Sequence, residues 1–113
     1  MARIVYSPES INDLEQIGDY IENTLQSFSA SLSTLQSIRK SINNLESFPY
    51  MGTLFTPNGI TRTDYRFLVC GNYLAFYRVE EVDEIYAHIV RIIYGKRDYV
   101  SILFGMIIKE ELE

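Results

Sequence analysis

Basic side chains in the second half of the chain are the residues whose types and spacing could do chemistry. Five of the ten basic residues lie in or just after the three strands predicted in this part, namely Arg66, Arg78, Arg91, Lys96 and Arg97. The last two belong to the cluster Gly95-Lys96-Arg97-Asp98, which directly follows a long apolar run at residues 85–94. Loops at strand ends carry function on a rigid scaffold. The cluster therefore predicts a cationic functional surface at one end of a sheet.

Arg91 interrupts an otherwise apolar strand, HIVRIIY. Burying an unpaired guanidinium is prohibitive, so its side chain must face water or meet a carboxylate. Strict alternation along the strand places Arg91 on the face of Ile89 and opposite to Ile92. Two interpretations stay open. One is a structural ion pair or an exposed sheet face, and the other is a cationic site on the uncovered face, shared with Lys96 and Arg97.

Other chemistries find little support in the sequence. His88 is the only histidine and Cys70 the only cysteine, so no pair of residues has the spacing of a zinc site. No glycine-rich stretch opens a helix to hold phosphate, and a serine nucleophile would have only His88 as a histidine base. We interpret His88 as a partly buried structural ring and Cys70 as a small core side chain. The sequence predicts no catalytic residue, no metal and no cofactor.

Length and composition suit one domain, residues 1–113, with 47% hydrophobic residues for a packed core. The net charge of −5 argues against strong nucleic-acid binding, which rests on many basic contacts to phosphate. A single cysteine fits a reducing compartment. No apolar run preceded by positive charge marks a signal peptide in this sequence, and no stretch reaches about 18 apolar residues. We therefore expect a cytoplasmic protein without membrane contact.

Two amphipathic helices are predicted after a first strand at Arg3–Tyr6. The first begins at Ser7, which can cap it, with Pro8 suited to the first turn. The second follows a serine-rich break at residues 27–31 and ends before Pro49. Apolar residues recur every three or four positions, at Ile11, Leu14, Ile17, Ile21, Leu25 and Phe28 in the first helix and at Leu32, Leu35, Ile38, Ile42, Leu45 and Phe48 in the second.

The other face of the first helix is acidic. It carries Glu9, Asp13, Glu15, Asp19 and Glu22, and no basic residue occurs between positions 7 and 36. We interpret this run as a solvated face, and the alternative is a docking face for a basic partner.

Three strands are predicted in the second half, at residues 64–70, 73–79 and 85–94. Gly71 and Asn72 are turn formers that join the first two strands as a hairpin. Residues 50–63 before them are expected to be a loop. Residues 99–113 stay open between a short helix, a strand extension and a free tail.

The predicted order is β-α-α-β-β-β. Tight turns make the last three strands an antiparallel meander, and the helical hairpin covers one of its faces because neither apolar stripe can stay in water. The first strand can join only at an edge or beside the last strand. The predicted fold is a two-layer α+β domain, whose other sheet face is less covered and open to binding.

The ordered set of motifs resembles the RelE/ParE superfamily of toxins from type II toxin–antitoxin modules. The stretches that carry the resemblance are SPESINDLEQIGDYI, LESFPYMG, YRFLVCGNYLAFYRVE and HIVRIIYGKRDYVSILF, spread over residues 3–105. RelE-like members of the superfamily cleave messenger RNA on the ribosome with basic residues and a terminal aromatic group. Leu74 and Leu103 stand where this resemblance would place an arginine and a catalytic tyrosine, whereas Arg97 fits both branches.

The chain looks more like the ParE-like branch, which inhibits DNA gyrase without an obvious nuclease site. The resemblance implies a toxin that binds gyrase rather than an enzyme, held in check by an antitoxin protein that wraps it, as a homodimer or a hetero-oligomer with that antitoxin. A RelE-like ribosome-dependent ribonuclease and a non-toxic interaction module are the alternatives. The candidate target-binding residues are Arg91, Lys96, Arg97 and Asp98, flanked by Tyr73 and Tyr99.

Overall fold

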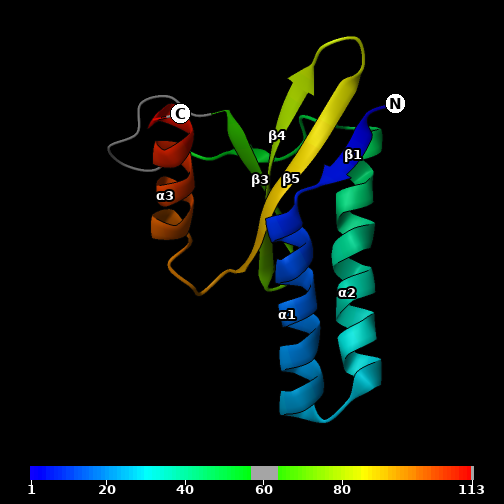
Figure 1. The fold of residues 1–113 in the computed structure, drawn as a ribbon. Helices are drawn as coiled ribbons and strands as arrows, with labels where there is room; N and C mark the ends of the chain where they lie inside the picture. Colours follow the sequence, from blue (N-terminus) through cyan, green and yellow to red (C-terminus); the bar gives the residue numbers. More distant parts are fainter. Residues whose placement is uncertain (57–63, 113) are drawn as a thin grey trace.

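A computed structural model of the 113-residue chain describes residues 1–56 and 64–112 (Figure 1). Within these two ranges, no helix combines the length and apolar character that a membrane span needs. Along the chain the elements are β1 (Arg3–Tyr6), α1 (Pro8–Leu25), α2 (Phe28–Asn43), the 3₁₀ turn η1 (Asn44–Glu46), β2 (Thr53–Leu54), β3 (Tyr65–Cys70), β4 (Tyr73–Glu81), β5 (Ile85–Tyr94) and α3 (Tyr99–Leu112).

The strands form one five-stranded sheet in the order β1-β5-β4-β3-β2. β3, β4 and β5 make an antiparallel meander, and β1 lies parallel to β5 at one edge, as predicted. The α1–α2 hairpin covers one face of the sheet, so the α+β prediction is confirmed (Figure 1). The prediction of a loop at residues 50–63 was wrong at β2, where Thr53 pairs with Phe67 and Leu54 with Arg66.

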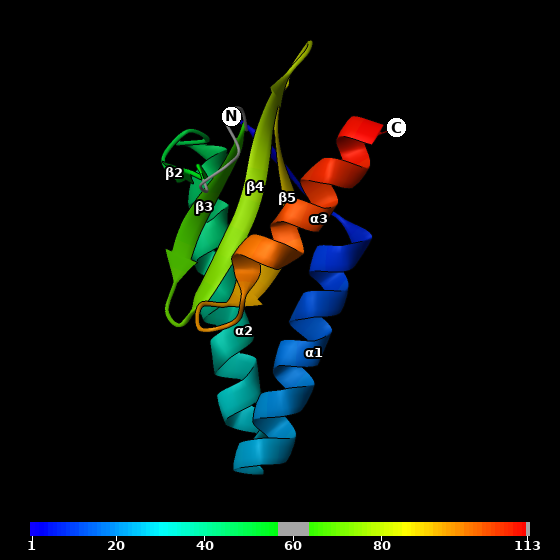
Figure 2. The same ribbon diagram turned by 90° about the vertical axis from the view of Figure 1, so that its left-hand side faces the viewer.

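The C-terminal helix α3 lies on the other face of the sheet (Figure 1), and Figure 2 shows it crossing β4 and β5. Leu103 of α3 is only 1% exposed and packs with Phe76 and Ile93 in a second core. Burying one such side chain contributes about 1.5–3 kcal/mol. The face that we expected to be open is therefore partly covered. Residues 99–112, left undecided by the sequence, are helical.

Capping residues set the limits of the two hairpin helices. The Ser7 hydroxyl oxygen accepts a hydrogen bond from the Ser10 N–H (3.0 Å), and the Ser27 hydroxyl accepts one from the Ala30 N–H (3.1 Å). α1 ends before Gln26, whose φ of 49° is left-handed. The break is shorter than the predicted residues 27–31, because Ser27 caps α2 directly instead of belonging to a loop.

The far end of the helical hairpin extends past the sheet (Figure 1). Leu25 and Phe28 at this end are 63% and 67% exposed, and Tyr20 and Leu32 are exposed as well. The prediction that both apolar stripes lie on the sheet was therefore wrong at this end, since the described strands stop short of it.

Tyr77 fastens the turn after η1 to β4. Its ring is buried, and its hydroxyl donates to the Pro49 carbonyl (2.8 Å) and accepts from the Gly52 N–H (2.9 Å). A Cβ on Gly52 would lie 2.6 Å from the Tyr77 hydroxyl oxygen and 2.9 Å from the Phe67 carbonyl oxygen. The stretch FPYMG is therefore held against β4 by Tyr77, and this contact positions the chain at the start of β2.

We predict that Gly52→Ala lowers the free energy of unfolding by about 1–3 kcal/mol, because the new methyl group meets the Phe67 backbone carbonyl. Gly105→Ala is the matched control, because a Cβ at this position of α3 meets no atom within 4 Å. It should be neutral or stabilising by up to about 1 kcal/mol. Urea unfolding followed by circular dichroism measures both variants. Equal effects of the two substitutions would contradict the close packing at Gly52.

Tyr77→Phe should destabilise the fold by about 1–3 kcal/mol at neutral pH, because the Gly52 N–H and the Pro49 carbonyl lose their partner. Burial raises the pKa of Tyr77 above its ordinary value. The phenol therefore contributes stability below about pH 10, and this contribution is lost as the pH rises through the folded-state pKa. In urea titrations above about pH 10, the stability gap between wild type and variant should narrow. A gap that widens there is the contrary result.

Candidate functional site

A β-bulge in β5 sets the position of Arg91. Tyr77 of β4 lies opposite Ile89, and Phe76 lies opposite Arg91, so Val90 is an additional residue in β5. A bulge shifts the side-chain alternation of the strand that carries it. Ile89 and Ile92 consequently pack in the same core, under the helical hairpin. The strict alternation predicted from the sequence was wrong here, because the bulge leaves no mark on the apolar pattern.

The Arg91 guanidinium forms a bidentate ion pair with Asp13 of α1. Its Nε lies 2.7 Å from Oδ2 and its Nη2 lies 2.9 Å from Oδ1 of the carboxylate. The Ile92 backbone N–H also donates to Oδ2 (2.9 Å). The hydrogen bond to Asp13 raises the pKa of Arg91 against the effect of burial. Of the two interpretations of Arg91, the geometry matches the structural ion pair.

Asp13 is the partner of Arg91 that the sequence reasoning missed. It was assigned to a solvated acidic face, and this was wrong, since Asp13 is only 7% exposed. Its position four residues before Ile17, one helical turn away, places it beside the apolar stripe. Together with the need of Arg91 for a carboxylate, this spacing was the signal that could have found it.

The turn at residues 95–98 is held by hydrogen bonds to Asn72, Tyr94 and Ser101. The Gly95 N–H donates to the Asn72 carbonyl (2.8 Å), and the Arg97 N–H donates to the Tyr94 carbonyl (2.9 Å). Asp98 accepts from the Ser101 N–H (3.2 Å) and the Ser101 hydroxyl (2.8 Å) at the start of α3. These hydrogen bonds lower the pKa of Asp98. Asp98 therefore starts a helix, while the side chains of Lys96 and Arg97 are exposed.

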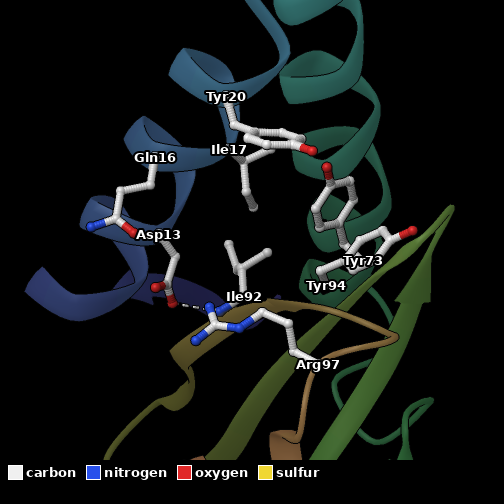
Figure 3. A pocket seen from close by; sticks show the side chains of 8 residues that line it. All are labelled: Asp13, Gln16, Ile17, Tyr20, Tyr73, Ile92, Tyr94 and Arg97. Atoms are coloured by element: carbon white, nitrogen blue, oxygen red, sulfur yellow. Dashed lines mark hydrogen bonds between the residues drawn. The ribbon is translucent and has the colours of Figure 1, made fainter. Parts of the chain in front are cut away.

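A pocket of about 380 Å³ lies between α1 and the ends of β4 and β5 (Figure 3). Ile17 and Ile92 give it an apolar centre, and the tyrosine rings gather on one side of it. Tyr73 and Tyr94 pack edge to face, with ring centroids 5.6 Å apart. The described residues that line the pocket are Asp13, Gln16, Ile17, Tyr20, Tyr73, Ile92, Tyr94 and Arg97.

The two charged side chains among the described residues that line this pocket, Asp13 and Arg97, differ in whether they already have partners. The carboxylate of Asp13 is already engaged by Arg91 and by the Ile92 N–H, which Figure 3 marks with a dashed line. Among the interactions of the described residues, none engages the Arg97 guanidinium. Burial, followed by the neighbouring Tyr94 and Tyr20, raises the pKa of Tyr73, so this phenol stays neutral. The pocket offers a free cation, phenol hydroxyls and an apolar floor.

The predicted site residues fall into three groups. Tyr73 and Arg97 line the pocket, and Lys96 lies beside it in the exposed turn. Arg91 is not among the described lining residues and is bound by Asp13, which is one of them. Asp98 caps α3, and Tyr99 packs on Phe76 with ring centroids 5.7 Å apart. Sequence reasoning missed Gln16, Tyr20 and Tyr94, because they come from α1 and from the last residue of β5.

The remaining candidates for chemistry lie away from the pocket lining. His88 Nε2 lies 3.3 Å from Glu80 Oε1, and the ring stacks on Tyr86. Cys70 is buried, and burial raises the pKa of its thiol. In the described parts of the chain, no three His, Cys, Asp or Glu side chains gather in a way that could hold a metal ion.

We predict that Asp13→Asn lowers the free energy of unfolding by about 3 kcal/mol, because it leaves the largely buried Arg91 guanidinium without its counter-ion. Asp19→Asn on the exposed side of α1 is the matched control and should change stability by less than about 0.5 kcal/mol. Urea unfolding at pH 7 measures both. A small loss at Asp13, comparable to that at Asp19, would show that Arg91 is readily resolvated.

Comparison with known proteins gives the family. The sequence model described as "ParE toxin of type II toxin-antitoxin system, parDE" matches residues 4–99. A solved structure described as "Chromosomal ParDE TA system from P. aeruginosa" has the same fold, with a TM-score of 0.68 and 20% identity over 85% of this chain and 98% of that chain. A search of curated proteins found no match. The chain with the pocket between α1 and the strand ends therefore belongs to the ParE family of type II toxins.

Proposed function

We propose that this ParE-family toxin inhibits DNA gyrase by binding it, and that the contact surface is the pocket together with the turn at residues 95–98. The observation that carries the proposal is the free Arg97 guanidinium beside an aromatic pocket, in a chain of the ParE family. Free cations next to exposed tyrosines are typical of protein-binding hot spots, which are rich in Tyr and Arg. Lys96 adds a second exposed cation to this surface.

Binding without bond cleavage is favoured over a RelE-like ribonuclease by two side chains. Leu74 and Leu103 stand at the two positions that the ribonuclease resemblance would fill with an arginine and a tyrosine, and both pack in the core beneath α3. A catalytic group at position 103 would be buried, because Leu103 is almost fully covered. The net charge of −5 also opposes the dense phosphate contacts of a ribosome-bound nuclease.

A cognate antitoxin protein is the second proposed partner, and the cytoplasm is the proposed location. The exposed apolar end of the helical hairpin, with Leu25, Phe28 and Leu32, offers an area that such a partner can cover. Amphipathic segments bind grooves and sheet edges of this kind in other peptide complexes. Light scattering on the purified toxin alone and on the toxin purified with its antitoxin decides whether the toxin forms a homodimer or assembles only with the antitoxin.

The test of the gyrase proposal is Arg97→Ala. It should relieve growth arrest on induced expression and raise the concentration for half-maximal inhibition of gyrase supercoiling by about tenfold or more, because a central charged contact is commonly worth about 2 kcal/mol. Lys40→Ala removes an exposed cation of α2, far along the chain from the turn, and serves as the control. It should leave both readouts at wild-type values. Unchanged toxicity of a folded Arg97→Ala protein rejects this contact surface.

The alternatives give different outcomes in the same experiments. Site-selective cuts in a defined message, in a translating extract, would favour the ribonuclease. Normal growth on induced expression of the wild-type toxin would favour a non-toxic interaction module. Intact message with blocked supercoiling supports the proposed function.

A further inference from the structure

We infer that the pocket is an anchor site for one bulky aromatic side chain that is followed by a carboxylate, on an exposed segment of the protein that the toxin inhibits. The inference rests on the proposed function only in assigning the segment to the inhibited protein. The chemistry of the occupant follows from the pocket itself.

The volume and lining call for one large apolar side chain. About 380 Å³ is near the lower end of ligand sites in proteins, which span roughly 300–1,000 Å³. The side chains of Ile17 and Ile92 point toward each other across its centre, and Tyr73 and Tyr94 already pack edge to face at 5.6 Å (Figure 3). A third ring from a partner extends this arrangement, because aromatic rings favour edge-to-face contacts at centroid distances of about 4.5–7 Å. Tyr20, exposed on α1, closes the same space.

The charges call for an anion next to that ring. Among the described residues of the lining, Asp13 is the only acid, and its two oxygens already accept from Arg91 and the Ile92 N–H. In the described part of the chain, Arg97 keeps its guanidinium free of partners and reaches the same pocket. Guanidinium binds carboxylate through two parallel hydrogen bonds. A neutral Tyr73 hydroxyl can donate to the same anion.

A peptide fits these observations better than a nucleic acid. The chain carries a net charge of −5, which repels a phosphate polymer, while a single carboxylate needs only the local cations Arg97 and Lys96. An aromatic residue beside an acidic one combines both requirements in two consecutive side chains.

The chain contains no tryptophan, so the fluorescence of a tryptophan probe reports binding without emission from protein tryptophan. The probes are acetyl-Gly-Trp-Asp-Glu-Gly-amide, the same peptide with Lys-Lys in place of Asp-Glu, and hexathymidylate as a competitor. We expect the acidic peptide to bind about tenfold more tightly than the basic one, since one charge-assisted contact distinguishes them. Equal affinities, no binding of either peptide, or tighter binding of hexathymidylate overturns the inference.

Two variants separate the ring from the charge. Arg97→Gln should bring the ratio of the two peptide affinities close to one, because it removes only the preference for the anion. Tyr20→Ala should weaken both peptides by a similar factor and keep the ratio. Both variants must give the wild-type circular dichroism spectrum. A ratio that survives Arg97→Gln assigns the charge preference to other residues and overturns the role of Arg97.

Only the last experiment uses gyrase. An excess of the acidic peptide should restore supercoiling that the wild-type toxin inhibits, whereas the basic peptide should not. If the acidic peptide binds the toxin but does not restore supercoiling, the segment that occupies the pocket does not belong to gyrase. This result overturns the assignment of the occupant. A toxin that never inhibits gyrase but binds the acidic peptide selectively rejects the proposed function and leaves the pocket chemistry standing.

Discussion

The Asp13 carboxylate is the interaction on which the arrangement of the site depends. The strand partners of β1 on β5 end at Ile89, and Ser7 takes the next two carbonyls of β5, at Ile89 and Val90. Beyond this point the outer edge of β5 needs a new partner, because a buried N–H without one costs about 1–3 kcal/mol. Asp13 supplies it to Ile92 and binds the neighbouring Arg91 as well. One side chain of α1 thus gives the edge of β5 a hydrogen-bond partner and neutralises a partly buried cation.

This contact also determines where the pocket walls stand. Gln16 and Tyr20 lie within two helical turns of Asp13, so a helix held at Asp13 holds them too. Tyr94 follows Ile92 by two residues and lines the pocket from the end of β5. The Asp13–Arg91 ion pair therefore fixes the distance between α1 and the ends of β4 and β5. The exposed residues of the pocket can then contact a partner while the core contacts stay intact.

Local patterns predicted most of the fold, and contacts between distant residues caused the misses. The two helices, the Ser7 cap and the Gly71 turn are encoded in a few consecutive residues, and they were predicted correctly, although the far ends of the apolar stripes do not lie on the sheet. The two-residue strand β2 has no period to detect, and its position depends on Tyr77 holding Gly52. The Asp13–Arg91 pair joins residues 78 positions apart, and the bulge that aims it changes no residue type. None of these leaves a mark in a short window of sequence.

The charged turn shows why a cluster in sequence is not a cluster in space. Lys96, Arg97 and Asp98 are consecutive, which invites the interpretation of one functional unit, or of cations neutralised by the neighbouring acid. Both oxygens of Asp98 are instead used by Ser101, because α3 needs a cap. The helix that covers the second sheet face thereby engages the carboxylate that directly follows Arg97 in the sequence. The cation stays available at the pocket because the acid beside it in sequence has a structural task.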